Sequence, residues 1–293
     1  MSNGKRFLKT WVPQGAVQLA RNALDHLRPA PWELLPGGWR TDRRLRGWNV
    51  ESIVATQRRK WPSFTAALQG PGPLGINHEA PEDAGREDPW AHNLIMSYGY
   101  VLALAASGKP RVSLLDWGGG IGHYYLIGQA LLPGTRLEYF CQEVPLLSQA
   151  GRELLPDATF CDQPDACFGR RYDLVMAGSS LWYERHWEDA AANLARAAQG
   201  YLYITRMLFV ESAASFAVVQ RPWAAGYRTE YQCWVLNRRE FIAAVEALGM
   251  RLVREFVFGP GPHIHKAPEQ AVFRGFLFQP AGNAPASTTT EGR

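Results

Sequence analysis

The sequence predicts an α/β protein with a mostly parallel sheet, helices on both faces of that sheet and a helical extension at the N-terminus. β-rich runs alternate with helical stretches between residues 111 and 205, which is the pattern of a parallel sheet wrapped by helices. A glycine-rich turn joins the first β-rich run to the helix after it. The last two runs, 252–258 and 271–278, are joined by a segment too short for a helical crossover, so the final strand should be antiparallel.

The composition is that of a folded protein with a large core. A chain of 293 residues with 46% hydrophobic and 20% charged residues can bury one large domain with an appendage. No apolar run approaches the roughly 20 residues of a membrane-spanning helix. The N-terminus also lacks a signal-peptide core with a cleavage site, so we expect a cytoplasmic protein. The four cysteines form no CxxC pair, which favours reduced, structural thiols.

The net charge of +4 is unevenly distributed along the chain. Residues 1–60 hold twelve Lys and Arg against four Asp and Glu, whereas the remainder holds nineteen against twenty-three. This basic end would suit peripheral contact with an anionic membrane surface or an acidic partner, and it would equally suit a solvated face of a helical extension. Because there is no dense run of basic residues, we expect no nucleic-acid binding.

The first 88 residues predict an extension or cap. Apolar residues at spacings of three and four predict a short amphipathic helix over 13–28. A weaker helical stretch covers 50–68, and a polar, proline-rich linker covers 70–88. We expect the main domain to span 89–280 and the tail, 281–293, to be disordered because it has little to bury.

The main domain should open with a helix over 89–107, because Asp88 suits its N-cap, Pro89 suits its first position and Gly108 suits its end. Strands are expected at 111–116, 136–142, 159–161, 172–177 and 201–205, with helices at 121–132, 146–155 and 188–198. Asn237 and Glu240 then form a capping-box pattern that opens a helix over 238–248.

The first predicted strand leads into a loop that could cradle a ligand. In an open α/β sheet, ligands bind beyond the carboxyl ends of the strands. Here those positions hold Asp116, which is followed by four glycines: Gly118, Gly119, Gly120 and Gly122. A glycine loop alone fits a plain tight turn as well as a nucleotide site. The spacing completes D-x-G-x-G-x-G, whereas the dinucleotide pattern needs a small residue at position 123, which is His123.

Carboxylates follow the next two predicted strands. Glu143 ends the second strand, 21 residues after Gly122, where it can accept hydrogen bonds from both hydroxyls of a ribose. Val144 beside it could pack on a base. Asp162 ends the third strand and could accept a hydrogen bond from an adenine amino group, with a solvated surface carboxylate as the alternative.

The segments LLDWGGGIG, CQEVP, FCD and YDLVMAGSSLWY resemble the class I S-adenosylmethionine-dependent methyltransferases over roughly residues 110–210. More closely, HNLIMSYGYVLALAA, GGGIGHYY, EVP, SSLWY, YITR and APEQAVFRGFLF are similar to an uncharacterised bacterial family of methyltransferase-like proteins after about residue 90. The basic N-terminal part matches poorly.

This resemblance implies a Rossmann-like methyltransferase fold, a seven-stranded sheet whose last strand is antiparallel. It implies S-adenosylmethionine as cofactor and S-adenosylhomocysteine as product. Asp116 and the loop 118–122 would then hold the methionine portion, Glu143 the ribose and Asp162 the adenine. The segment after the fourth strand would line the methyl-transfer site, including Ala177, Gly178 and Ser179.

Methyl transfer depends mainly on in-line placement, because the sulfonium is already activated. A general base would help with a hydroxyl or ammonium acceptor, and the candidates near the strand ends are His123, Tyr183 and His186. For His123, a helix-start residue that only bonds the backbone is the alternative. Candidate substrate-binding residues, each with plain packing or an ion pair as its alternative, are Tyr98, Tyr100, Tyr124, Trp182 and Arg206.

His263 and His265 lack an evident third ligand, so we expect no metal site. The favoured function is a methyltransferase that modifies oxygen or nitrogen of a small-molecule or glycan-type acceptor. One rival is an NAD(P)-dependent oxidoreductase, which uses a related fold. The other is a non-catalytic scaffold that binds S-adenosylmethionine.

Overall fold

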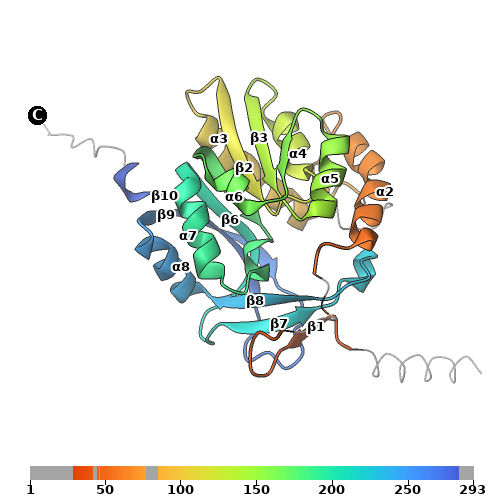
Figure 1. The fold of residues 1–293 in the computed structure, drawn as a ribbon, viewed down its shortest axis with the longest axis vertical. Coiled ribbons are helices and arrows are strands. Elements are labelled where there is room, and N and C mark those ends of the chain that lie inside the picture. The colour runs from red at the N-terminus through yellow and green to blue at the C-terminus, as the bar shows by residue number, and fades with distance from the viewer. Residues whose placement is uncertain (1–28, 42–44, 46, 77–84, 284–293) are drawn as a thin grey trace, which may run out of the picture.

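A computed structural model of the chain describes residues 29–41, 45, 47–76 and 85–283. Its main sheet has the order β4-β3-β2-β5-β6-β10-β9 (Figure 1). The first five of these strands pair in parallel, and β10 runs antiparallel to both of its neighbours. In chain order the strands are β2 (Arg111–Trp117), β3 (Arg136–Gln142), β4 (Thr159–Cys161), β5 (Tyr172–Gly178), β6 (Ala198–Val210), β9 (Met250–Pro260) and β10 (Val272–Pro280). The predicted fold class and its antiparallel last strand are confirmed.

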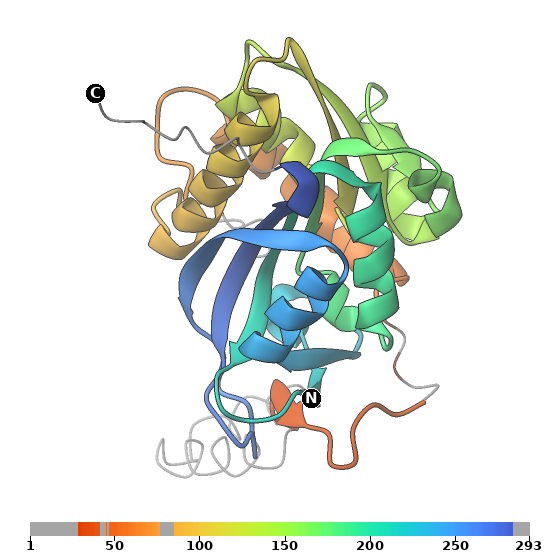
Figure 2. The same cartoon turned by 90° about the vertical axis from the view of Figure 1, so that its left-hand side faces the viewer.

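Helices cover both faces of this sheet (Figure 2). One hydrophobic cluster joins the sheet to α2 (Glu51–Ala67), α3 (Pro89–Ala106), α4 (His123–Leu131) and α5 (Pro145–Leu154). A second cluster joins the opposite face to α6 (Pro164–Phe168), α7 (Trp187–Ala197) and α8 (Arg238–Ala247). The sheet is therefore buried on both sides, which is why its central strands read as continuous apolar runs.

The helix boundaries follow from capping residues. The Asp88 carboxylate accepts a hydrogen bond of 2.9 Å from the Trp90 N–H, and Pro89 takes the first position of α3. Gly108, just past the helix, has a φ of 72°. The capping box at α8 forms in part: Asn237 Oδ1 accepts from the N–H groups of Arg239 and Glu240. The Asn237 N–H, however, donates to Ser215 Oγ at 2.8 Å, and that hydroxyl in turn donates to Glu240 Oε2 at 3.2 Å.

A second, antiparallel group of strands extends the sheet and was not predicted. It contains β1 (Trp32–Leu34), β7 (Phe216–Gln220) and β8 (Tyr231–Asn237), which lie at the bottom of Figure 1. The prediction of a strand ending at residue 205 was wrong, because β6 continues to Val210 and its last two residues pair in parallel with β8. β6 extends past the end of β5, and the backbone groups of this extension find hydrogen-bond partners in β8.

The described N-terminal residues pack directly on the main domain. β1 pairs with β7, and α2 confirms the weak helical stretch and lies beside α5 (Figure 1). Arg58 of α2 forms an ion pair with Glu153 of α5, and the Asn49 carbonyl Oδ1 accepts from the Leu146 N–H at 3.1 Å. The helix predicted over 13–28 lies outside the described residues, as does most of the predicted tail, of which 281–283 form a 3-10 turn.

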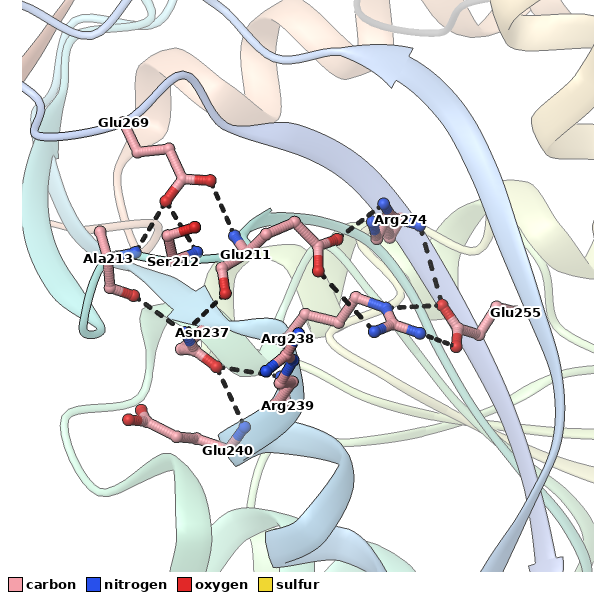
Figure 3. A network of polar contacts seen from close by, with 10 residues as sticks. All are labelled: Glu211, Ser212, Ala213, Asn237, Arg238, Arg239, Glu240, Glu255, Glu269 and Arg274. Carbon is pink, nitrogen blue, oxygen red and sulfur yellow. Dashed lines mark hydrogen bonds and ion pairs between the residues drawn. The ribbon is translucent and has the colours of Figure 1, made fainter.

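A polar network holds the loop that follows β6 (Figure 3). Glu269 accepts hydrogen bonds from three consecutive backbone N–H groups, those of Glu211, Ser212 and Ala213, which hold the pKa of its carboxyl below the ordinary value. The Asn237 side-chain amide donates to the Ala213 carbonyl at 2.9 Å, and so ties the α8 cap to the same loop.

Replacing Asn237 with alanine should lower the free energy of unfolding by about 1–2 kcal/mol, because a buried helix cap and its amide contacts are lost. Urea denaturation of the two proteins measures the difference. Replacement of exposed Glu246 on the same helix by glutamine is the control and should leave stability within about 0.5 kcal/mol. Equal stability of the Asn237→Ala protein and the wild type would contradict the capping role.

Candidate active site

One cavity lies where the carboxyl ends of β2, β3 and β5 meet beside Arg206 of β6, the place that the sheet topology predicts for a ligand. The structure brings many of the candidate residues together on its wall: Asp116, Gly118, Gly119, Gly120, His123, Tyr124, Glu143, Val144, Gly178, Ser179, Tyr183 and Arg206. It adds residues that sequence reasoning did not single out: Trp48, Gln57, Trp117, Gln142, Ser180 and Glu184.

Two glycines of the loop are required for different reasons. Gly118 has a φ of 75°, and a Cβ there would lie 2.3 Å from the Cβ of Ser180. Gly120 has a φ of 62°, but a Cβ there would meet nothing closer than Gln57 Oε1 at 3.7 Å. Gly118 therefore permits the packing of two strand ends. Gly120 instead leaves room on the cavity side for a ligand to approach the backbone.

Asp116 is a buried carboxylate beneath the glycine loop. It is 1% exposed, and the Tyr139 hydroxyl donates a hydrogen bond of 2.5 Å to its Oδ2. Burial raises the pKa of its carboxyl to about 7, Tyr139 opposes that shift, and the nearby Glu143 adds to it. Without a compensating positive charge in the cavity, this group is costly to ionise.

Glu143 is the second buried carboxylate and contacts the loop at Gly120. Its Oε1 accepts from the Gly120 N–H at 3.2 Å, and its Oε2 accepts from the Val144 N–H at 2.5 Å. Burial raises the pKa of its carboxyl to about 7 in spite of these two bonds. The carboxylate is thus held in a fixed position, and its remaining lone pairs are free to accept from a ligand hydroxyl.

Backbone strain lies just after the end of β5 and within β6. Ser179 and Arg206 both have a φ of 57°, which non-glycine residues rarely adopt. The Ser179 hydroxyl donates to the Arg206 carbonyl at 2.9 Å, and the Ser179 N–H donates to the Thr205 carbonyl at 3.0 Å. Strain of this kind concentrates at functional sites. The Arg206 guanidinium lies 5.3 Å from the ring centre of Trp90 on α3.

An aromatic wall closes the cavity opposite the sheet. Trp48 stacks on Tyr231, with ring centres 4.6 Å apart, and meets Tyr183 edge-on at 5.3 Å. The Tyr183 hydroxyl donates to Gln220 Oε1 at 2.8 Å. Trp48 comes from the N-terminal segment, and Tyr231 from β8. Trp48 and Tyr183 line the cavity, and Tyr231 of β8 supports Trp48 from behind without lining it.

His123 begins α4 and is buried beneath α2. Its ring packs edge-on against Phe64 at 4.7 Å and against Trp61 at 5.2 Å. Its Nδ1 lies 3.9 Å from the position of a Cβ on Gly120. The imidazole is therefore held between α2 and the loop.

Gln57 of α2 has a buried polar atom aimed at the loop. The residue is 4% exposed, and its Oε1 has no hydrogen-bond partner among the described residues. A buried acceptor without a partner costs free energy, so its presence on a cavity wall indicates a ligand that donates to it. The signal available in the sequence was slight: Thr56, Gln57 and Lys60 are polar residues on the buried face of a helix whose apolar periodicity is weak.

Other candidate residues lie outside the cavity. Asp162 forms an ion pair of 3.3 Å with Arg152 at the surface. Gly122 caps α4, where a Cβ would lie 2.5 Å from Leu155 Cδ1. Ala177 is buried in the core, Tyr100 is 43% exposed, and His186 lies in a separate surface hollow. The Tyr98 hydroxyl donates to the Tyr124 carbonyl, and the Trp182 indole N–H donates to the Ser179 carbonyl.

The described residues contain neither a candidate metal cluster nor a candidate membrane-spanning helix. No three His, Cys, Asp or Glu side chains within 29–41, 45, 47–76 and 85–283 gather closely enough to hold a metal ion. No helix in the same residues has both the length and the apolar character needed to cross a membrane.

No protein-family model matches the chain, and no curated protein matches it. Several solved structures are similar to it, and some of these are named as methyltransferases. One such enzyme from Clostridium acetobutylicum is 10% identical, with a TM-score of 0.41 over 64% of this chain and 89% of its own. DesVI of Streptomyces venezuelae is 16% identical, with a TM-score of 0.41 over 67% and 94%. The CcbJ methyltransferase of Streptomyces caelestis is 14% identical, with a TM-score of 0.41 over 64% and 88%.

Proposed function

We propose that this protein is an S-adenosylmethionine-dependent methyltransferase that acts on a small molecule. The observation that carries the proposal is the pair of buried carboxylates, Asp116 and Glu143, beside the Gly118–Gly120 backbone in one cavity. S-adenosylmethionine combines an ammonium and a sulfonium with a ribose diol. Its donors and positive charges are what two desolvated carboxylates need.

The residues fit this cofactor in a definite order along the sheet edge. Asp116 and the loop backbone would hold the methionine portion, and Glu143 would accept from the ribose hydroxyls. Val144 would pack on the adenine, while Gly178 and Ser179 would lie beside the methyl group. Asp162 could reach the adenine amino group only by exchanging its ion pair with Arg152. Gln57 Oε1 has no partner within the described part of the chain and faces the loop at Gly120, where the methionine portion would lie. It would therefore accept a hydrogen bond from the ammonium of that portion.

The protein's contribution to methyl transfer would be placement and exclusion of water. The bound cofactor supplies a methyl group on a positively charged sulfur, which needs no further activation. The strained backbone at Ser179 and Arg206 would hold β5 and β6 in place beside the acceptor. Trp48 and Tyr183 line another part of the cavity wall and would exclude water there. Holding donor and acceptor in line converts a bimolecular encounter into a step of effectively unimolecular character.

The nicotinamide alternative fits this site less well. A dinucleotide loop needs a small residue at position 123 so that the helix can approach the pyrophosphate. That position holds the His123 ring, packed against Phe64. The two acidic groups beside the loop would also repel a pyrophosphate.

The catalytic part of the proposal is tested with methyl-labelled S-adenosylmethionine and fractionated small-molecule extract. We expect the wild-type protein to transfer label to an extractable compound and the Glu143→Gln protein to transfer far less. Cofactor binding without transfer in any fraction would favour the scaffold alternative instead.

Replacing Gln57 with leucine should weaken binding of S-adenosylhomocysteine about tenfold, because one hydrogen bond to a charged group is lost. Thermal stability of the unliganded protein should not fall, since the change removes an unpaired buried oxygen. Calorimetric titration and thermal unfolding measure the two effects. Gln69→Leu, at an exposed position past the end of α2, is the control. Unchanged affinity in a folded Gln57→Leu protein would remove this residue from the site.

A further inference from the structure

Glu184 is a cavity-lining carboxylate that the cofactor assignments leave unused. It follows the 3-10 turn Leu181–Tyr183 at the end of β5 and stands at the rim of the cavity, where part of the residue meets solvent. Within the part of the chain that the structure describes, its carboxylate makes no hydrogen bond or ion pair. Asp116 and Glu143, by contrast, each accept hydrogen bonds from the protein. Glu184 therefore has its full accepting capacity available to a ligand.

The backbone holds Glu184 in place although its side chain is unpaired. Its N–H donates to the Leu181 carbonyl at 3.1 Å, and its carbonyl accepts from Trp234 Nε1 at 3.1 Å. Neighbouring protein removes water from the carboxyl and raises its pKa. A partly desolvated carboxylate without a partner gains more from a bound cation than a fully hydrated one does.

The surfaces beside Glu184 also favour a cation. Tyr183 and Trp48 line the same cavity, and aromatic rings attract ammonium groups through their electron-rich faces. Arg206, which also lines the cavity, has its guanidinium over the Trp90 ring on α3. The guanidinium charge of Arg206 thus lies toward α3, whereas the carboxylate charge at the rim of the cavity is that of Glu184.

From this arrangement we propose that the methyl acceptor is a primary or secondary amine, bound as its ammonium form by the Glu184 carboxylate beside Tyr183 and Trp48. The inference rests on the proposed methyltransferase function and narrows it to nitrogen methylation. Glu184 would be a substrate-binding residue, and its position at the rim gives it contact with water.

The reaction balances with these groups alone. The ammonium passes one proton to the Glu184 carboxylate, which releases it to solvent at the rim. The freed nitrogen lone pair then forms the new bond to the methyl carbon as the carbon–sulfur bond breaks, and the electron pair of that bond remains on sulfur as a thioether. The methylated nitrogen carries the positive charge and gives up a second proton to water if a neutral product leaves.

The test compares matched amines and alcohols on the full-length protein. S-adenosylhomocysteine is titrated first, and then 2-phenylethylamine, cyclohexylamine and glucosamine are titrated into that complex beside 2-phenylethanol, cyclohexanol and glucose. We expect at least one amine to bind about tenfold more tightly than its alcohol. We also expect this preference to disappear in the Glu184→Gln protein and to remain in the Glu246→Gln control, whose carboxylate is exposed on α8.

The outcomes separate the two proposals. If S-adenosylhomocysteine does not bind the wild-type protein, the proposed function fails. If it binds with equal affinity to wild-type and Glu184→Gln protein, Glu184 lies outside the cofactor site as assigned. Alcohols that bind as tightly as amines, absence of binding by every amine, or a preference for amines that survives in Glu184→Gln would each overturn the amine proposal.

Discussion

Replacing Glu143 with glutamine should weaken binding of S-adenosylhomocysteine by roughly 1–3 kcal/mol, or about 5- to 150-fold, because hydrogen bonds from the ribose to a charged acceptor are lost. The backbone N–H groups of Gly120 and Val144 fix this carboxylate, so no other described side chain can take its place. Calorimetric titration measures the change. Glu246→Gln serves as the control, and a folded Glu143→Gln protein with wild-type affinity would refute the ribose assignment.

The same carboxylate gives the effect a pH dependence of known sign. In the unliganded protein the pKa of Glu143 is about 7, above its ordinary value of 4.5, so the folded state keeps a proton that the unfolded state has lost between those values. The contribution of this group to stability should therefore be fully present below about pH 4.5 and should be lost as the pH rises to about 7. Asp116, with a pKa also near 7, contributes in the same direction.

Ligand binding should show the opposite trend. A ribose held by the ionised carboxylate binds more tightly as the pH rises through 7, and binding below that pH releases protons. As the pH rises, the Glu143→Gln protein should lose less stability and gain less affinity for the ligand than the wild type does. Thermal unfolding and titration between pH 5 and 8 measure both, and equal slopes in the two proteins would contradict the assigned pKa.

Alanine at Gly118 should have the largest effect on folding, about 2–5 kcal/mol lower stability. The residue would have to adopt a left-handed conformation, and its Cβ would overlap that of Ser180 at 2.3 Å. Alanine at Gly120 should cost only about 1–2 kcal/mol of strain, because open cavity surrounds the new methyl group. That methyl should instead obstruct the ligand.

Chemical denaturation and titration of the two glycine variants distinguish these roles. The Gly118→Ala protein should unfold at a clearly lower denaturant concentration. Gly120→Ala should remain folded but lose most of its affinity for S-adenosylhomocysteine. A Gly120→Ala protein that binds as the wild type does would show that no ligand approaches the loop at this residue.

The features that the sequence predicted are those with local causes. Asp88 and Asn237 cap helices through bonds to residues two or three positions away, and the glycine loop needs its backbone shape regardless of what surrounds it. The antiparallel last strand followed from the short connection before Ala271. Each of these depends on neighbours in the chain, so a single sequence contains the necessary information.

The features that were missed depend on residues far apart in the chain. β1 exists because Trp32–Leu34 meets β7, whose Gln220 pairs with Trp32 across 188 residues. Gln57 lies in the site only because α2 docks beside α5. His186 was a candidate base, yet Glu184 lines the cavity, because the chain after Glu184 turns toward another surface hollow that His186 lines.

The most direct test of the account is a calorimetric titration of the unliganded protein with S-adenosylhomocysteine and, separately, with NADH and NADPH. We predict one site per chain for S-adenosylhomocysteine, with affinity that increases between pH 5 and 7, and no measurable binding of either nicotinamide. Binding of NADH or NADPH in place of S-adenosylhomocysteine would contradict the assignment of the loop, Asp116 and Glu143 to a methyl-donor cofactor.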